Sequence, residues 1–86
     1  MVKVYLPSRM RAAAQQQTWV EVEATTVQGV LNALIQSFPD LSTFILHNGQ
    51  LNRYTRIFVN SQEVKNLIQP IAINDEIHII QAMAGG

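Results

Sequence analysis

The sequence contains no cysteine, few charged residues and no long apolar run. The absence of cysteine among 86 residues excludes a disulfide, a thiol nucleophile and a cysteine-ligated metal site. Charged residues make up only 14% of the chain, and six basic residues balance six acidic ones. A nucleic-acid-binding protein needs a clustered basic face, so we expect no nucleic-acid partner. No apolar stretch is long enough for a signal peptide or a bilayer span, so we expect a cytoplasmic protein with no membrane partner.

The spacing motifs of common enzyme active sites are also missing. The two histidines, His47 and His78, lie far apart in the sequence, and no HExxH, GxSxG or P-loop spacing occurs. A small enzyme needs a pocket with convergent polar groups, and no cluster in the sequence would supply them. We therefore expect no catalytic residue, no metal site and no bound cofactor in this chain.

The sequence does contain enough apolar residues for one small folded domain. Hydrophobic residues make up 48% of the chain, which fits a compact core rather than disorder. A domain of this size buries only about 60–65% of the surface that its unfolded chain exposes, so it folds with little margin. We assign residues 1–82 to the domain and residues 83–86 to a flexible C-terminal diglycine tail.

Two alternating segments near the N-terminus predict a β-hairpin. Apolar and polar residues alternate through residues 2–6 and again through residues 18–24, the period of a half-buried strand. Residues 8–17 break the alternation and carry a glutamine run, so we expect a turn or a long hairpin loop there. Ala12–Ala14 could form a helical turn, but so short a piece is marginal without tertiary support. The pattern leaves open whether Trp19 lies off the core or wraps over the hairpin edge.

An amphipathic helix over residues 26–38 is the best-defined element. Thr26 is a natural N-cap, because its hydroxyl can accept a backbone N–H of the first turn, and Pro39 ends the helix. Gly29 costs about 1 kcal/mol of helix propensity against alanine, so we expect close packing against a strand there. Apolar residues follow at helical spacing: Val27, Val30, Leu31, Leu34, Ile35 and Phe38.

Two further strands, at residues 53–60 and 76–81, complete the expected fold. The Asn48-Gly49 pair predicts a turn with positive φ, and we expect another turn at residues 60–64. The inward positions of the two strands are apolar: Ile57 and Val59 in the first, Ile77 and Ile79 in the second. The order strand, strand, helix, strand, strand predicts an α+β protein with a mixed sheet of four to five strands packed on one main helix.

Strand order does not follow from this pattern alone. The strands on either side of the helix are expected to be parallel. The last strand is expected in the middle of the sheet, beside the first or the third strand.

The final strand leads directly into two glycines, Gly85 and Gly86. Such glycines have no structural role after a last strand, so we interpret them as a working part of the chain rather than an unstructured end.

The segments "IFVNSQEV" (residues 57–64) and "INDEIHIIQAMAGG" (residues 73–86), with the helix at residues 26–38, resemble the MoaD/ThiS-type sulfur-carrier family of ubiquitin-like β-grasp proteins. The stretch "LNRYTRIFVNSQEV" (residues 51–64) looks most like the CysO branch of that family. The resemblance spans nearly the whole chain and implies the β-grasp fold. Family tails often carry proline where this chain has Gln81-Ala82-Met83, which weakens an assignment to the molybdopterin or thiamine pathway.

The resemblance implies that the Gly86 carboxylate is the reactive group. An activating enzyme would adenylate it, and a sulfur donor would convert it to a thiocarboxylate that donates sulfur in cofactor or cysteine biosynthesis. The chain would then be a carrier substrate rather than an enzyme, or the small subunit of a molybdopterin-synthase-like complex. The implied partners are a ubiquitin-activating-like adenylyltransferase, which uses ATP, and a sulfur-acceptor enzyme of a biosynthetic pathway.

The tail residues are the first set of candidate partner-binding positions. Gly85 and Gly86 lack a Cβ, so the backbone can approach a phosphate closely in the partner's ATP site. Met83 and Ala84 are expected to occupy pockets of the partner while the tail pairs in a strand-like manner.

The open face of the sheet supplies the second set. Tyr5, Phe58 and Ile80 should point away from the helix, next to His78. Scattered exposed apolar residues are normal on a protein surface. Three of them on adjacent strands that lead to the tail, however, predict a patch for the activating enzyme.

Two alternative functions stay open at this point. In the first, the chain is a ubiquitin-like modifier, and Gly86 forms an isopeptide bond to lysine. In the second, the chain is a non-covalent β-grasp interaction module with an idle tail. The pathway that receives the sulfur also stays open.

Overall fold

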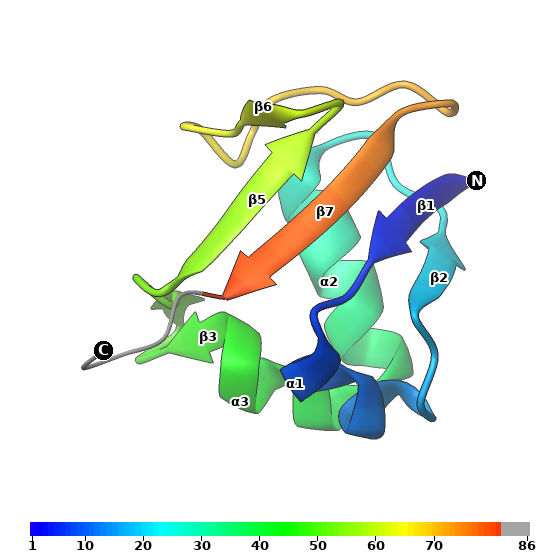
Figure 1. Ribbon diagram of the computed structural model, residues 1–86. Helices are drawn as coiled ribbons and strands as arrows, with labels where there is room; N and C mark the ends of the chain where they lie inside the picture. The colour runs from blue at the N-terminus through cyan, green and yellow to red at the C-terminus, as the bar shows by residue number, and fades with distance from the viewer. Residues whose placement is uncertain (82–86) are drawn as a thin grey trace.

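Residues 1–81 are described by a computed structural model. A five-stranded mixed sheet lies against one main helix, α2 (Val27–Ser37), which packs across one face of the sheet (Figure 1). The strands of the sheet are β1 (Val2–Tyr5), β2 (Trp19–Val22), β5 (Thr55–Val59), β6 (Gln62–Glu63) and β7 (Glu76–Gln81). The predicted α+β class, with a sheet on a single main helix, is therefore confirmed.

β7 lies in the centre of the sheet, whose strand order is β2-β1-β7-β5-β6. It runs parallel to β1 and antiparallel to β5. The prediction of a central last strand is confirmed, and β7 has both candidate neighbours at once. β2 and β5, which flank α2 in the sequence, run in the same direction, as predicted.

The pairing of β7 is unequal along its length. In the described part of the chain, β1 pairs with Glu76–His78, whereas β5 pairs with Ile77–Gln81. The last three residues of β7 therefore have a strand partner on one side only.

The core lies between the sheet and α2. Its buried residues are the inward positions of the strands and the apolar stripe of the helix: Val2, Val4, Leu6, Val20, Val22, Val27, Val30, Leu31, Leu34, Ile57, Val59, Ile77 and Ile79. Both sets were expected from the two periods in the sequence. Ile35 and Phe38, predicted for the same helix face, are only partly buried against this core.

The N-terminus of α2 has the predicted cap. The Thr26 Oγ1 accepts a hydrogen bond of 3.0 Å from the Gly29 N–H. A Cβ at position 29 would lie 3.3 Å from the Cβ of Ala24, two residues beyond β2. Gly29 is therefore closely packed, as expected, but against the segment that follows β2 and not against the strand itself.

The turn or long loop predicted for residues 8–17 is wrong for residues 8–14, whereas the helical turn considered for residues 12–14 is present. The segment holds a short helix, α1 (Ser8–Arg11), and a 3₁₀ turn, η1 (Ala12–Ala14). Met10 and Ala14, at i and i+4, are fully buried. Isolated helices this short are unstable in water, so burial of these two side chains against the distant core stabilises the segment.

A separate small hairpin joins β3 (Leu46–His47) to β4 (Gln50–Leu51). Its turn is the predicted Asn48-Gly49 pair, with φ of 54° and 77°. The hairpin follows a 3₁₀ turn, η2 (Pro39–Leu41), and a short helix, α3 (Ser42–Ile45).

The β5–β6 hairpin differs in detail from the expectation. The strand predicted from residue 53 begins at Thr55. Asn60 and Ser61 form the turn, with φ of 50° and 74°, the left-handed geometry of the tight hairpin turns whose twist matches that of paired strands. The turn predicted for residues 60–64 is therefore correct for the first two residues, whereas Gln62–Glu63 pair with β5 as β6.

Candidate functional site

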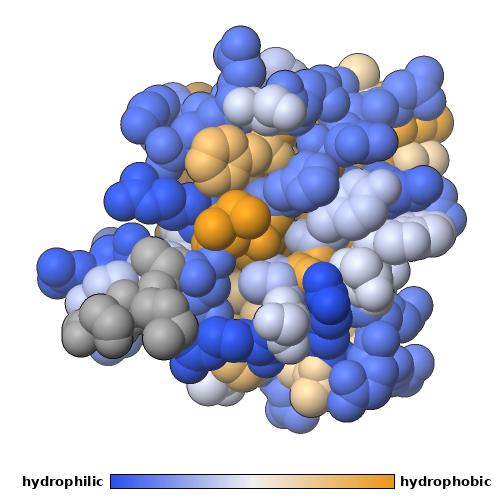
Figure 2. All heavy atoms as spheres, in the orientation of Figure 1, coloured by the Kyte–Doolittle hydropathy of each residue, from blue (hydrophilic) through white to orange (hydrophobic). Residues whose placement is uncertain are grey.

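Four of the predicted partner-binding residues lie together on the sheet face opposite the core. They alternate along their strands with buried residues and define what we call the docking face: Tyr5, Phe58, His78 and Ile80. The strand register places His78 opposite Tyr5 on β1 and opposite Phe58 on β5. Apolar side chains gather at the centre of this face (Figure 2). Their convergence is a structural fact, and their role in binding stays a prediction.

The imidazole of His78 lies at the middle of the docking face. The Tyr5 ring stacks on it, with 4.5 Å between ring centroids and 10° between ring planes. The Nε2 of His78 is 3.9 Å from the Oε1 of Glu76. Stacked rings contribute about 0.5–1.5 kcal/mol beyond their area burial, so this pair makes the centre of the docking face more rigid.

Ile80 is the most exposed apolar member of the docking face. Its exposed fraction is 47%. With Phe58, Ser61 and His78 it lines an open, shallow hollow of about 350 Å³. An exposed aliphatic side chain beside aromatic rings is the kind of apolar patch at which proteins dock.

Trp19 extends this face across the edge of the sheet. It pairs with Tyr5 in the register of β1 and β2, and it is 41% exposed. The Nζ of Lys3 lies 4.5 Å from the centroid of the indole ring, within the range of a cation–π contact. The position that the sequence left open is therefore on the sheet face, under Lys3. The alternation of β2 already indicated this position, because neighbouring residues of a strand face opposite sides of the sheet and Val20 is buried.

An ion pair flanks the docking face on the β5 side. The Arg56 Nη1 is 2.9 Å from the Glu63 Oε2 on β6, and Arg56 is the cross-strand partner of Ile80. The hydrogen bond from Arg56 is the largest cause that lowers the pKa of Glu63 below its ordinary value, and Lys65 adds a smaller effect. The Arg56 guanidinium thus favours the ionised form of the half-buried Glu63 carboxylate.

A hydrogen-bonded cluster holds the start of β7. The Asn60 Nδ2 donates to the Asp75 Oδ1 at 2.9 Å, while the Asn60 Oδ1 accepts from the Glu76 N–H at 3.0 Å. The Ala72 N–H donates to the other Asp75 oxygen at 2.8 Å. Ala72 first and Asn60 second lower the pKa of Asp75. The cluster fixes the entry of β7 into the sheet, at the end farthest from Gln81.

The opposite end of β7 is tied to α3. The Gln81 Nε2 donates to the carbonyl oxygen of Phe44 at 3.4 Å, and the Thr55 Oγ1 donates to the same oxygen at 3.0 Å. Sequence reasoning missed both residues. The available signal was a glutamine at an inward position of an alternating apolar strand. The remaining predicted site residues lie outside the described residues: Met83, Ala84, Gly85 and Gly86.

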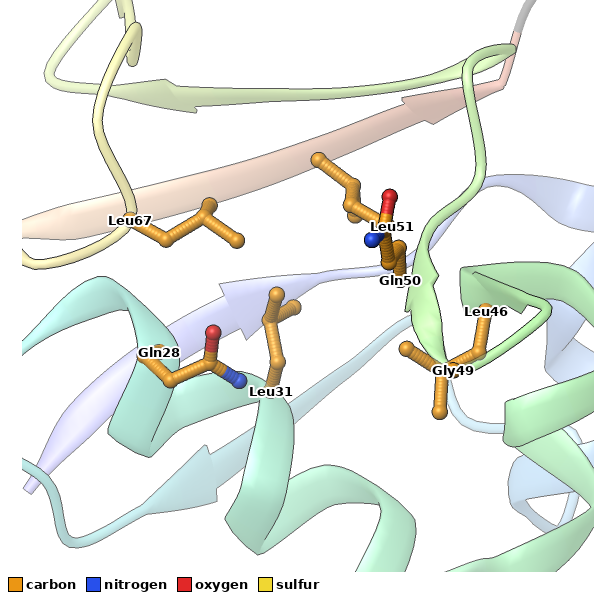
Figure 3. A pocket seen from close by; sticks show the side chains of 7 residues that line it. All are labelled: Gln28, Leu31, Leu46, Gly49, Gln50, Leu51 and Leu67. Carbon is orange, nitrogen blue, oxygen red and sulfur yellow. The ribbon is translucent and has the colours of Figure 1, made fainter.

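A second hollow, of about 420 Å³, lies between α2, the β3–β4 hairpin and the segment after β6 (Figure 3). Its lining consists of aliphatic and amide side chains and one glycine: Gln28, Leu31, Leu46, Gly49, Gln50, Leu51 and Leu67. The sequence did not predict this hollow. No titratable side chain lines this hollow, so its lining residues cannot supply acid–base catalysis.

Two general features are absent from the described part of the chain, a metal-binding cluster and a membrane-spanning helix. Residues 1–81 contain no group of three or more His, Cys, Asp or Glu side chains placed to hold a metal ion. Over the same residues, each helix is too short or too polar to cross a membrane.

Solved structures with the same fold come from several organisms. CysO of Mycobacterium tuberculosis superposes with a TM-score of 0.86 at 26% identity, covering 96% of this chain and 100% of that chain. Small archaeal modifier protein 1 of Methanosarcina acetivorans has a TM-score of 0.87 at 26% identity, covering 99% of this chain and 95% of that one. A chain of the Amycolatopsis orientalis BexX/CysO complex superposes with a TM-score of 0.89, and the match covers 100% of this chain and 100% of that chain. At 22% identity this likeness shows the fold alone. A comparison with curated protein sequences finds no match.

The structural neighbours identify the architecture as the ubiquitin-like β-grasp, as the sequence resemblance implied. The sequence profile of the ThiS family matches residues 4–86. Members of this family are small ubiquitin-like carrier proteins rather than enzymes. Because the match covers nearly the whole chain and the fold agrees, this protein belongs to the ThiS family.

Proposed function

We propose that this protein is a sulfur carrier whose Gly86 carboxylate is adenylated by an ATP-dependent activating enzyme and then converted to a thiocarboxylate. The thiocarboxylate delivers sulfur to an acceptor enzyme of a biosynthetic pathway. Family membership supports the carrier role, and the details of activation are the proposal.

The observation that carries this proposal is the course of β7. The central strand presents His78 and Ile80 on the docking face and reaches Gln81, five residues before Gly86. Five extended residues span at most about 18 Å. A partner that binds the docking face would therefore contact the strand that directly precedes the C-terminal segment with the reactive carboxylate.

The proposed chemistry places little demand on the side chains of the carrier. An oxygen of the Gly86 carboxylate attacks the α-phosphorus of ATP, and pyrophosphate leaves. Hydrosulfide then attacks the acyl carbon, AMP leaves, and loss of the sulfur-bound proton leaves the thiocarboxylate. Glycine at this position puts no Cβ beside the attacked carbonyl. Acid–base groups and the metal that accompanies ATP would belong to the partner.

Intact-mass measurement tests the proposal. The protein is incubated with its cognate activating enzyme, ATP and a sulfide source. We expect a mass increase equal to the exchange of one oxygen for one sulfur, located on Gly86 by fragmentation and absent without ATP. The proposal fails if the wild-type protein gains neither AMP nor sulfur, or if the mature chain carries residues beyond Gly86.

A second candidate function is supported by the likeness to small archaeal modifier protein 1 at 26% identity. In that case the activated Gly86 would form an isopeptide bond to lysines of other proteins. Conjugates in cells that disappear when Gly86 is deleted would favour the modifier. Full partner binding after deletion of Gly85 and Gly86 would instead favour a non-covalent interaction module.

A further inference from the structure

Gln81 stands at an inward position of β7, where the strand is otherwise apolar. Side chains alternate along a strand, so Gln81 falls on the same side as the buried Ile77 and Ile79. Its side-chain amide reaches across to the Phe44 carbonyl oxygen, which also accepts the hydroxyl of Thr55. Thr55 is the cross-strand partner of Gln81. One carbonyl of α3 therefore anchors the adjacent ends of β5 and β7.

The end of β7 depends on such an anchor because its backbone pairing is one-sided. Among the described strands, β1 pairs with β7 only as far as His78, and residues 79–81 pair with β5 alone. Strand ends with few partners open locally at low free-energy cost. A side chain that reaches from Gln81 to α3 opposes this fraying.

Stability by itself does not account for a glutamine at this position. The buried Oε1 of Gln81 has no hydrogen-bond partner among the residues that the structure describes. A buried acceptor without a partner is unfavourable, whereas an apolar side chain would gain from burial. A hydrogen bond, unlike an apolar contact, has a direction. The amide is thus suited to orienting the end of the strand.

We propose that Gln81 is a positioning residue that acts through the Phe44 carbonyl to fix the position and direction of the end of β7, the point from which the chain continues to Gly86. The inference rests on the proposed carrier function, and it explains why a glutamine stands at position 81. If residues 79–81 detach, Ile80 leaves the docking face and the end of β7 is no longer held in one place. The partner must then order more of the chain on binding, which lowers its affinity.

Gln81→Glu is the test variant, because it keeps the size of the side chain but places an acceptor against the Phe44 carbonyl. We expect the KM of the carrier for its activating enzyme to rise about tenfold, with kcat little changed. Acidification should reduce the defect, since a protonated carboxyl can again donate to Phe44. Gln36→Glu, on the exposed side of α2, makes the same change without an anchor and should match the wild type at every pH.

Gln81→Leu separates orientation from packing. Leucine keeps the burial and removes both the hydrogen bond and the unpartnered oxygen. We expect a melting temperature equal to or above that of the wild type, together with a raised KM. A purely structural role would move the melting temperature and leave KM unchanged.

NMR provides a readout that needs no partner. The backbone {¹H}–¹⁵N heteronuclear NOE of residues 79–81 should fall in Gln81→Glu and stay unchanged in Gln36→Glu. The inference is overturned if these NOE values do not change, or if wild type, Gln81→Glu and Gln81→Leu share one KM. Failure of the proposed carrier function would give a different result, since the wild type itself would then show no adenylation. The NOE comparison would still test whether Gln81 holds the end of β7.

Discussion

Ile80→Asp is the sharpest test of the docking face. The isoleucine is 47% exposed and lies opposite Arg56, on the face away from the core. Replacing it with aspartate removes the apolar contact offered to a partner and adds a charge. The fold should tolerate the change, because the position is already half in water.

The expected loss of affinity follows from the exposed fraction of the side chain. Fully burying an isoleucine is favourable by about 1.5–3 kcal/mol, so burying the exposed half on docking contributes about 1 kcal/mol. Desolvating the new carboxylate in the interface adds about 1–3 kcal/mol, because the neighbouring Arg56 guanidinium is already paired with Glu63 and offsets only part of this cost. The total of about 2–4 kcal/mol corresponds to a KM roughly 30-fold to 1,000-fold higher.

The assay is AMP formation by the activating enzyme as a function of carrier concentration, with thermal unfolding measured on the same samples. Ile73→Asp is the matched control, because Ile73 is 66% exposed and lies outside the docking face. We expect the control to keep the wild-type KM. A KM within twofold of wild type for Ile80→Asp, or an equal rise for both variants, would refute the assignment of this face.

Three further outcomes are expected. Leu34→Ala should lower the free energy of unfolding by about 2–5 kcal/mol in urea titration, because Leu34 is fully buried under the sheet; an unchanged denaturation midpoint would contradict its place in the core. Gly86→Ala should strongly slow adenylation, since a Cβ crowds the attacked carbonyl, and leave the melting temperature unchanged; normal adenylation would contradict the close-approach argument. Hydrogen bonds from Ala72 and Asn60 lower the pKa of Asp75 below its ordinary 3.8, so the stability that ionised Asp75 contributes is present above that value and is lost as pH falls through the folded pKa. The melting temperature of Asp75→Asn should therefore fall less steeply on acidification below pH 3.8 than that of the wild type, and parallel curves would exclude Asp75 as a source of the acid sensitivity.

The sequence predicted the elements whose signals are local. The helical stripe around Leu34, the cap at Thr26 and the turn at Asn48-Gly49 each depend on residues within a few positions of one another. Alternation also placed Ile80 outward, because a strand side chain can face only one of two ways.

One error falls where distant contacts override local preference, and the other concerns the exact length of a local turn. Residues 8–14 have no strong helix signal, and their helical form depends on burying Met10 and Ala14 in a core built by the rest of the chain. The two residues of β6 are a strand only because the Asn60-Ser61 turn returns them to β5.

The sequence by itself determined the class of fold, the buried and exposed face of each long strand, and the membership of Tyr5, Phe58, His78 and Ile80 in the open face. The tertiary structure alone decided that β7 lies between β1 and β5, that the Tyr5 and His78 rings stack, and that Gln81 reaches Phe44, 37 residues away. The physical reason is the range of the interactions. Periodicity and caps act between near neighbours, whereas strand order, ring stacking and the Gln81 anchor exist only once separate segments are brought together.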